Sequence, residues 1–427
     1  MKNKIKERLY SRKLDDQAKV FALASNKKYS SIFRLSVKLK ENVNEELLQQ
    51  AVGLALEKFK AFKVRMKKGM FWDYFVENEM MPIVIPEENT LFKKVNTRAN
   101  NKYLFRVTYL ENKINIEFFH ALTDGNGGSQ FFKEILYRYL ELMYPNKLEF
   151  TQLDENEIVY DTENAYVKNY QKNVRKKYRT KIAHMIKGKE LEHGKVGISH
   201  FNINLPQVKQ CTKLEHCSLS MYLTAMIAYS IYEGEYKIHK GRRPINLCLP
   251  ISLQKYFGSE TISNFFSYMI LTLKPKKYKN YSFEDFLDMV KKEFEKKFKL
   301  ERIIETMSND AGMTNNPIVK AVPLVIKKFA VRLGSLKVKR HFTMTISNIG
   351  KFDVSSKYTE FVDNAFVMLA PDWAEKMKCG ICSYGDNLVV SFGTFLKDSM
   401  IEERFKELLE KNNIKFKFEN NLNYLSC

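Results

Sequence analysis

Apolar and polar residues alternate in the first patterned stretch of the chain. Between residues 31 and 40, apolar side chains occupy every second position from Phe33 to Leu39, which predicts a β-strand with one buried face. Helical spacing follows at 44–59, where apolar residues recur every three to four positions behind Asn44. Asn44 suits the N-cap because its side-chain oxygen can accept a hydrogen bond from a backbone N–H of the first turn.

The same two periodicities predict the remaining elements. Alternation on either side of short polar turns predicts strand pairs at 62–78 and 103–120, and a strongly amphipathic helix at 129–144 stops at Pro145. The elements predicted for the second half are strands at 195–205, 242–253, 263–275, 341–350 and 379–395, and helices at 218–232, 283–298, 316–333 and 398–411. Strands and helices are mixed in both halves, which indicates an α+β fold.

The length of the chain predicts two lobes, because 427 residues exceed the usual size of a single hydrophobic core. Between the two patterned halves, the stretch from Lys168 to Lys189 carries nine Lys and Arg residues and no acid. We interpret this stretch as part of a solvated linker. The expected organisation is therefore an N-terminal lobe at 1–160, a basic linker at 161–194 and a C-terminal lobe at 195–427.

The net charge of +22 would attract polyanions such as nucleic acids, anionic membranes or phosphate-bearing cofactors. The lysines are spread along the whole chain instead of gathering on one element among stacking aromatics, so no nucleic-acid partner is expected. The predicted helix at 316–333 is basic and amphipathic, which allows two interpretations. It makes transient contact with an anionic membrane surface, or it packs across a core with its lysine stems turned outward, the interpretation that we favour.

The chain lacks the apolar core of a secretory signal at its start, and its longest apolar stretch, at 218–232, is too short and too polar to cross a bilayer. A cytoplasmic location and a monomeric state are expected. Cys379 and Cys382 have the spacing of a metal-binding pair, but the sequence has no second CxxC or HxxxH pair to complete a four-ligand zinc site. No metal is expected.

One short motif carries candidate chemistry. The segment HALTDG, from His120 to Gly125, lies where a predicted strand meets a predicted helix. A histidine at a strand end can present its imidazole at the mouth of a crevice and take up a proton near neutral pH. Asp124 can hold the loop by accepting hydrogen bonds. Gly125, Gly127 and Gly128 allow close backbone approaches that a Cβ atom would block.

The longer segment EFFHALTDG resembles the active-site motif of the acyltransferase superfamily that includes chloramphenicol acetyltransferases, peptide-synthetase condensation domains and plant BAHD acyltransferases. It is most similar to the bacterial alcohol acetyltransferases. Other stretches resemble landmarks of that group in the same order, namely LLQQAVGLALEKFKAFKVRM, FWDYFVEN, NFFSYMILTL and TISNIG. The resemblance implies a two-lobed fold of the chloramphenicol-acetyltransferase type, each lobe a mixed sheet with helices, and an active-site channel between the lobes.

The resemblance also implies roles for single residues. His120 would be the general base that removes a proton from a hydroxyl or amine acceptor, which then attacks the thioester of acyl-CoA or of an acylated carrier. Acyl-CoA would be a co-substrate, and the acceptor a small-molecule or lipid-like alcohol or amine. Asp124 would be structural and paired with Lys63 or Arg65. Phe119 stands where condensation domains often have a second histidine, which argues against peptide-bond synthesis on carriers.

The segment TISNIG resembles the channel floor of the family. There, Ser347 or Asn348 would donate a hydrogen bond to the developing oxyanion, although both also suit an ordinary turn at a strand end. The alternative function is that of a non-catalytic member of the same fold, which binds acyl-CoA or a carrier protein without turnover. The intact HALTDG segment favours the enzyme, because a binding protein has no need of the histidine.

Overall fold

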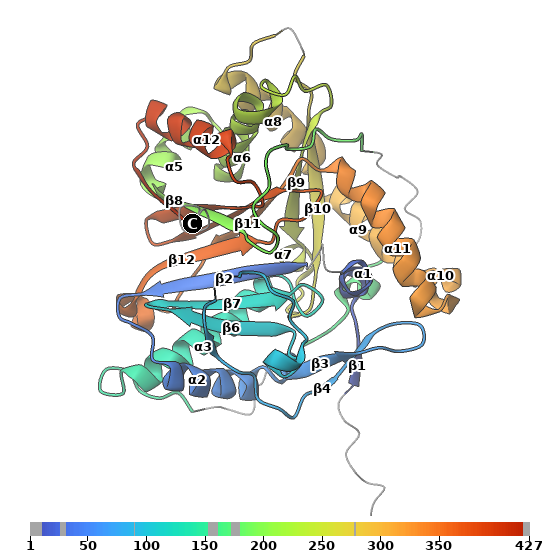
Figure 1. Ribbon diagram of the computed structural model, residues 1–427, viewed down its shortest axis with the longest axis vertical. Helices are drawn as coiled ribbons and strands as arrows, with labels where there is room; N and C mark the ends of the chain where they lie inside the picture. Colours follow the sequence, from blue (N-terminus) through green and yellow to red (C-terminus); the bar gives the residue numbers. More distant parts are fainter. Residues whose placement is uncertain are drawn as a thin grey trace, which may run out of the picture.

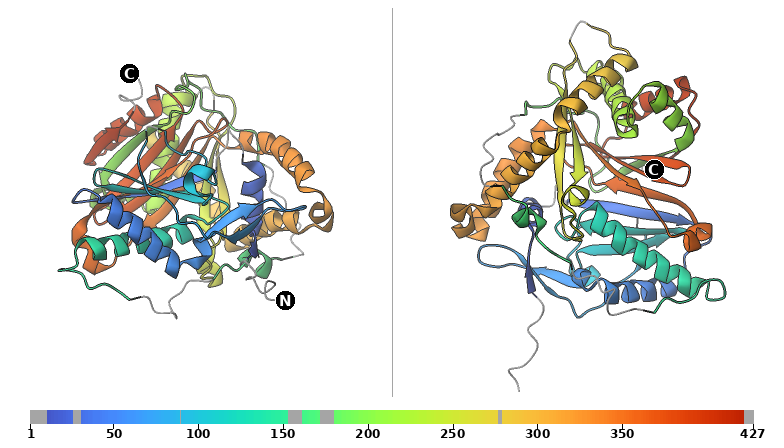
Figure 2. Two further views of the ribbon diagram at one scale, coloured as in Figure 1. Left: turned by 60° about the horizontal axis from the view of Figure 1, so that its bottom comes forward. Right: turned by 180° about the vertical axis from the view of Figure 1, so that it is seen from behind.

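The computed structural model describes residues 11–25, 31–88, 90–152, 161–171, 180–276 and 279–421, apart from the side chains of 332 and 335–339. Two lobes lie one above the other, each built around a sheet with helices on its outer side (Figures 1 and 2). Within these residues, no helix has both the length and the apolar composition that crossing a membrane requires.

A five-stranded sheet forms the centre of the first lobe. Its strands, in spatial order, are β12 (Val362–Leu369), β2 (Ile32–Leu39), β7 (Lys113–Phe119), β6 (Phe105–Leu110) and β5 (Ile85–Pro86). Neighbouring strands are antiparallel except for β5 and β6. The helices that cover the outer face of this sheet are α2 (Glu45–Lys58) and α3 (Gly125–Met143) (Figure 1). As predicted, Asn44 caps α2 by accepting from the backbone N–H of Leu47 at 3.0 Å.

Strand β2 is buried on both faces, which corrects the prediction of a single buried face. Its polar face carries Arg34, whose guanidinium is buried and pairs with Glu87 and Glu117. Glu117 also accepts a hydrogen bond from Arg106 on β6. The polar face of β2 can be buried because these charged groups neutralise one another inside the protein, whereas the prediction had left that face exposed.

A seven-stranded sheet forms the centre of the second lobe. Its strands, in spatial order, are β10 (Phe266–Leu273), β9 (Ile245–Ser252), β11 (Met344–Lys351), β13 (Met377–Tyr384), β14 (Asn387–Thr394), β8 (Gly197–Asn204) and β15 (Phe416–Asn420). Strand β11 is parallel to both of its neighbours, and the other pairs are antiparallel. The helices on its outer face are α5 (Leu205–Leu214), α6 (Leu219–Ile231), α8 (Phe283–Lys297) and α12 (Met400–Lys411) (Figure 1).

A small sheet and a further group of helices lie at one side of the two lobes (Figure 1). The sheet contains, in spatial order, β1 (Ser11–Lys13), β4 (Tyr74–Glu77) and β3 (Val64–Lys67). The helices at this side are α1 (Asp16–Ala24), α9 (Leu300–Asn315), α10 (Pro317–Ala321) and α11 (Leu324–Val338), and two further short helices are α4 (Ala165–Lys168) and α7 (Gln254–Phe257). The single helix predicted at 316–333 is thus two helices, because Pro323 cannot continue α10.

Packing does not follow the chain order at one point. Strand β12 comes from the second half of the chain but pairs with β2 in the sheet of the first lobe. The lobes predicted from boundaries at 160 and 194 are continuous segments of the chain. In the structure, β12 lies beyond these boundaries in sequence but packs in the first lobe. Parts of the predicted linker are docked: the Tyr166 hydroxyl donates to the Phe266 carbonyl at 2.7 Å, and the Ala183 N–H donates to the carbonyl of Arg340 at 2.8 Å. The most basic part of the linker, at 172–179, lies outside the described residues.

Candidate active site

The HALTDG segment forms the loop between β7 and α3. Strand β7 ends at Phe119, and α3 begins at Gly125, before the predicted start at 129, because Asp124 acts as the N-cap. Oδ1 of Asp124 accepts from the backbone N–H of Asn126 at 3.0 Å and from that of Gly127 at 3.1 Å. These are two of the donors that the first turn of a helix leaves without a partner.

The other carboxylate oxygen of Asp124 reaches the second lobe. Oδ2 accepts from the backbone N–H of Phe265 at 2.9 Å. Burial raises the pKa of Asp124, and the backbone donors oppose that rise. Neither Lys63 nor Arg65 is an ion-pair or hydrogen-bond partner of Asp124 in the described part of the chain, and the ammonium group of Lys63 lies 3.6 Å from Glu57. The prediction of a basic partner fails because backbone N–H groups, from the start of α3 and from Phe265, already bind the carboxylate.

His120 lies among three aromatic rings. Its imidazole stacks on Phe21 with ring centroids 4.3 Å apart, and the centroids of Phe33 and Phe266 lie 5.0 and 5.4 Å away. Nδ1 of His120 lies 3.0 Å from Oδ1 of Asn264. Burial lowers the pKa of His120 to about 4, and the hydrogen bond to Asn264 opposes that shift. The imidazole is therefore neutral near pH 7.

Asp15, just before α1, orients the side chain of Asn264. Oδ2 of Asp15 accepts from the backbone N–H of Asn264 at 3.3 Å and from its Nδ2 at 3.1 Å, while Oδ1 caps α1 at the N–H of Ala18. Burial raises the pKa of Asp15 to about 6. Because Nδ2 of Asn264 is turned toward this carboxylate, Oδ1 faces His120 and can only accept. His120 therefore carries its proton on Nδ1 and the lone pair on Nε2.

Residues 261–266, which we term the clasp loop, hold the motif from the side of the second lobe. Besides the contacts of Asn264 and Phe265, the hydroxyl of Thr123 donates to the carbonyl oxygen of Ile262 at 2.7 Å. The same carbonyl oxygen would lie 2.3 Å from a Cβ atom added to Gly127. Gly127 is therefore needed for the close approach of the two lobes, and the clasp loop contacts the motif along most of its length.

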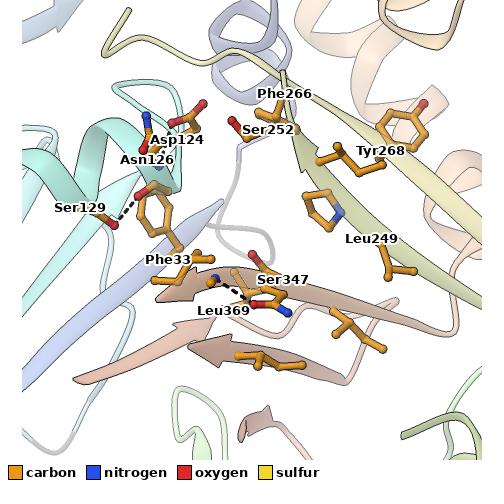
Figure 3. A pocket seen from close by; sticks show the side chains of 18 of the residues that line it. Phe33, Asp124, Asn126, Ser129, Leu249, Ser252, Phe266, Tyr268, Ser347 and Leu369 are labelled. Atoms are coloured by element: carbon orange, nitrogen blue, oxygen red, sulfur yellow. Dashed lines mark hydrogen bonds between the residues drawn. The ribbon is translucent and has the colours of Figure 1, made fainter. Parts of the chain in front are cut away.

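A cavity of about 1670 Å³ lies between the lobes, and His120 is part of its wall. Residues from the start of α3 line one side, and residues of β9 and β10 line the opposite side (Figure 3). The lining residues labelled in that view are Phe33, Asp124, Asn126, Ser129, Leu249, Ser252, Phe266, Tyr268, Ser347 and Leu369. The motif therefore borders a space large enough for two substrates.

Both predicted oxyanion residues lie on β11 and line this cavity, as does Gly125. Ser347 points into the cavity in Figure 3. The side chain of Asn348 is engaged with its neighbours, since Nδ2 donates to the hydroxyl of Ser220 at 3.3 Å and Oδ1 accepts from the N–H of Gly350 at 2.9 Å. Of the two, Ser347 is the better placed to contact a substrate.

The lining of the cavity differs from one part to another. Lys133, Lys255 and Lys351 line the cavity together with the acidic residues Asp161, Glu260 and Asp353, and Lys351 pairs with Asp353 at 2.7 Å. The large apolar side chains in the part bordered by β9, β10 and α8 are Leu249, Met269, Phe294, Phe298 and Phe342. The lysine side chains can contact phosphate groups, and the apolar part suits a carbon chain or ring system.

The described residues hold no group of three or more His, Cys, Asp or Glu side chains that could bind a metal ion. Cys379 and Cys382 both lie on β13 but point to opposite faces of it. Cys379 packs in the core of the second lobe and Cys382 in the core of the first. Their CxxC spacing is therefore explained by packing on the two sides of one strand.

Sequence reasoning missed three residues of this site. Asn264 lies in NFFSYMILTL, which the family resemblance singled out without assigning a role to any residue in it. Asp15 stands before a short helix, a pattern that indicates a cap and nothing further. Ser31 has a φ of 51°, lines the cavity and buries a hydroxyl that has no hydrogen-bond partner in the described part of the chain.

Neither a protein-family model nor the sequence of a curated protein matches this chain. Solved structures do match it. TRI101 from F. graminearum, complexed with coenzyme A and T-2 mycotoxin, has a TM-score of 0.64 at 11% identity, over 95% of this chain and 99% of that one. TRI3 trichothecene 15-O-acetyltransferase from Fusarium sporotrichioides has a TM-score of 0.57 at 10% identity, with 95% and 96% covered.

A third match is the starter condensation domain of rhizomide synthetase RzmA in complex with C8-CoA. Its TM-score is 0.56 at 12% identity, over 94% of each chain. At these identities the likeness establishes the fold. It confirms the expected α+β architecture of two lobes, because nearly the full length of each chain is matched. The chain therefore has the two-lobed fold shared by chloramphenicol-acetyltransferase-like acyltransferases and condensation domains.

Proposed function

We propose that the protein is an acyltransferase that moves an acyl group from acyl-CoA to a hydroxyl or amine acceptor, with Nε2 of His120 as the general base. The observation that carries this proposal is the state of His120. Its ring borders the cavity between the lobes, and its Nδ1 proton is directed at Oδ1 of Asn264. A neutral imidazole with its lone pair on Nε2 is what a general base requires.

The transfer takes place in one direct displacement through a tetrahedral intermediate. Nε2 of His120 takes the proton of the acceptor hydroxyl or amine while its oxygen or nitrogen bonds to the thioester carbon. The intermediate collapses by breaking the carbon–sulfur bond, and the leaving thiolate of CoA takes the proton back from His120. Ser347 donates a hydrogen bond to the oxyanion. Asn264 acts as a positioning residue, because it keeps the proton on Nδ1 throughout.

The choice of CoA as donor rests on two supports. Solved structures with this fold contain coenzyme A or C8-CoA, and another is named an acetyltransferase. In this chain, the exposed Lys255 and the half-buried Lys133 line the cavity near the start of α3. We assign them to the phosphates of CoA, so that the acyl thioester reaches His120 from the side of α3 and the acceptor occupies the apolar part.

The experiment is a matrix of donors and acceptors. The protein is incubated with acetyl-CoA, octanoyl-CoA or palmitoyl-CoA and with a panel of alcohols and amines, and release of the CoA thiol and the mass of the product are measured. We expect thiol release that depends on the acceptor and an ester or amide of matching mass. Acyl-CoA that raises the melting temperature with no turnover for any pair would instead identify a non-catalytic binding protein.

A further inference from the structure

Seven large apolar side chains are exposed at the side of the molecule formed by α10, α11 and the β3–β4 hairpin loop. We call this surface the docking face. Its members, with their exposed fractions, are Met70 76%, Phe71 41%, Ile318 76%, Val325 80%, Ile326 57%, Phe329 67% and Leu333 52%. Single exposed apolar residues are ordinary on a protein surface, but a group of this size marks an interaction site.

The hairpin and the helix are joined, so that their apolar residues belong to one surface. The backbone N–H of Leu324, at the start of α11, donates to the carbonyl of Met70 at 2.9 Å. Nζ of Lys327 donates to the carbonyl of Phe71 at 2.9 Å and lies 3.7 Å from the centre of the Trp72 ring. In Figure 1, the loop between β3 and β4 extends to the same edge of the molecule as α10.

The apolar residues of α11 form one stripe. Val325, Phe329 and Leu333 are separated by four positions each, and Ile326 is adjacent, so they share a face of the helix. The interpretation that we favoured from sequence had this helix packing across a core. The structure shows the opposite arrangement, because the stripe faces solvent and Lys327 is buried.

The charge around the docking face is positive. Residues 316–340 include seven Lys and Arg and no Asp or Glu. Lys67 and Lys68, in the hairpin, and Lys320, in α10, are exposed. The buried carboxylate of Asp73 is paired with Lys328 at 2.9 Å, so these two charges cancel and the other six Lys and Arg of this segment carry the positive charge.

We propose that the docking face binds the surface of an anionic lipid bilayer. An apolar stripe flanked by lysines is the design of a helix that lies in the plane of a membrane surface, with the stripe entering the acyl region and the lysines contacting anionic headgroups. The occupant must accept both features at once. A bilayer does so, whereas a second copy of this chain would bring one basic face against another.

The docking face also lies close to the cavity. Helix α1 packs against α11, and the Phe21 of α1 stacks on His120. Membrane binding would therefore hold the cavity next to the bilayer. This proposal rests on the exposed surface alone and stands whether or not the protein transfers acyl groups.

The test is sedimentation with vesicles. We measure partition of the full chain onto vesicles of phosphatidylcholine alone and of phosphatidylcholine with phosphatidylserine. The structure predicts binding to the anionic vesicles that weakens as salt is raised. The double variant Val325→Ser and Phe329→Ser should weaken that binding by about 100-fold, since each buried side chain is worth about tenfold. Reversing the charge at this position with Lys320→Glu should weaken binding to the anionic vesicles by about fivefold or more.

The matched control is Leu214→Ser, which removes an equally exposed side chain (78%) at the end of α5 and should leave partition unchanged. All substituted apolar side chains are exposed, so the melting temperature should not move. No partition of the wild-type chain onto anionic vesicles would overturn the proposal. Equal partition of the wild-type chain and of the Val325→Ser and Phe329→Ser double variant would also overturn it. A wild-type dimer in sedimentation velocity that this variant converts to a monomer, with no vesicle binding, would assign the face to a second copy instead.

Discussion

Replacing Asn264 tests how the general base is positioned while His120, the base itself, stays in place. The side chain of Asn264 accepts from His120 and donates to Asp15, and it is completely buried. Asn264→Ala removes the acceptor at Nδ1 and leaves the imidazole free to carry its proton on either nitrogen. Asn264→Asp keeps an acceptor there. Because its second oxygen faces Asp15, the two carboxyl groups share one proton, and the remaining negative charge lies beside the ring. The two variants therefore have opposite effects on the pKa of His120.

The magnitudes follow from the contacts. One neutral hydrogen bond is worth about 0.5–1.5 kcal/mol, so loss of the bond to His120 should lower kcat/KM of Asn264→Ala by about 2–12-fold. With both side-chain hydrogen bonds gone, the free energy of unfolding should fall by about 1–3 kcal/mol. In Asn264→Asp, a carboxylate next to Nδ1 should raise the pKa of His120 by about 1–3 units, because it favours the imidazolium.

The assay is the pH dependence of kcat/KM, followed by CoA thiol release with the best donor and acceptor. The base must be neutral, so activity is present above the pKa of His120 and is lost as the pH falls through it. For the wild-type chain the acidic limb should therefore lie near pH 4. In Asn264→Asp the limb should move up by about 1–3 pH units. In Asn264→Ala it should not rise, because the lost hydrogen bond had favoured the imidazolium.

The control is Asn100→Ala. Asn100 is also buried, and its Nδ2 donates to the carbonyls of Tyr103 and Phe105 at 2.9 and 3.1 Å, away from the cavity. It should lose stability to a similar extent with no movement of the acidic limb. The positioning role would be refuted by an acidic limb of Asn264→Asp that coincides with that of the wild type. Full activity of Asn264→Ala at reduced stability would refute it equally.

Substitutions at Asp124 and Gly127 test how the motif is held. Asp124→Ala removes an N-cap and a buried acceptor for the Phe265 N–H, so stability should fall by about 2–4 kcal/mol together with activity. The stability and activity of Asp124→Asn should lie between those of the wild type and those of Asp124→Ala. Denaturant unfolding checks both, and activity lost at full stability would contradict a structural role. Gly127→Ala places a methyl group 2.3 Å from the carbonyl of Ile262 and should cost about 1–3 kcal/mol. Gly334→Ala, with nothing within 4 Å, should not destabilise, and equal stability of both variants would refute this packing argument.

Local patterns predicted the elements and the motif well. The alternation before His120 and the helical spacing after it placed the motif at a strand-to-helix junction, and β7 and α3 lie there. The cap at Asn44 was also found from sequence. Each of these features depends on residues within a few positions of one another, which is the range that periodicity and capping rules describe.

The contacts that complete the site were beyond that range. Asn264 is separated from His120 by 144 positions and from Asp15 by 249. No local pattern reports such a pairing. The same reason explains the wrong partners of Asp124: Lys63 and Arg65 were chosen by charge, whereas the structure supplies backbone donors from the clasp loop. Strand β12 likewise joins β2 from the far end of the chain.

The exposed stripe of α11 shows a different limit of prediction from sequence. Its apolar positions have the spacing of a core-facing helix, and the sequence alone gives no sign of which surface the helix faces. Only the positions of α1 and of the β3–β4 hairpin show that Lys327 is covered and that Val325 and Phe329 are not.

The measurement that tests the central claim most directly is the turnover of His120→Ala under conditions where the wild-type chain releases CoA thiol. General-base catalysis is worth about 10²–10⁴ in rate, so kcat should fall by that factor. The fall should exceed the 2–12-fold loss expected for Asn264→Ala. Melting curves of both proteins establish that the variant is folded at the assay temperature. Turnover of folded His120→Ala at the wild-type rate would contradict the assignment of His120 as the base.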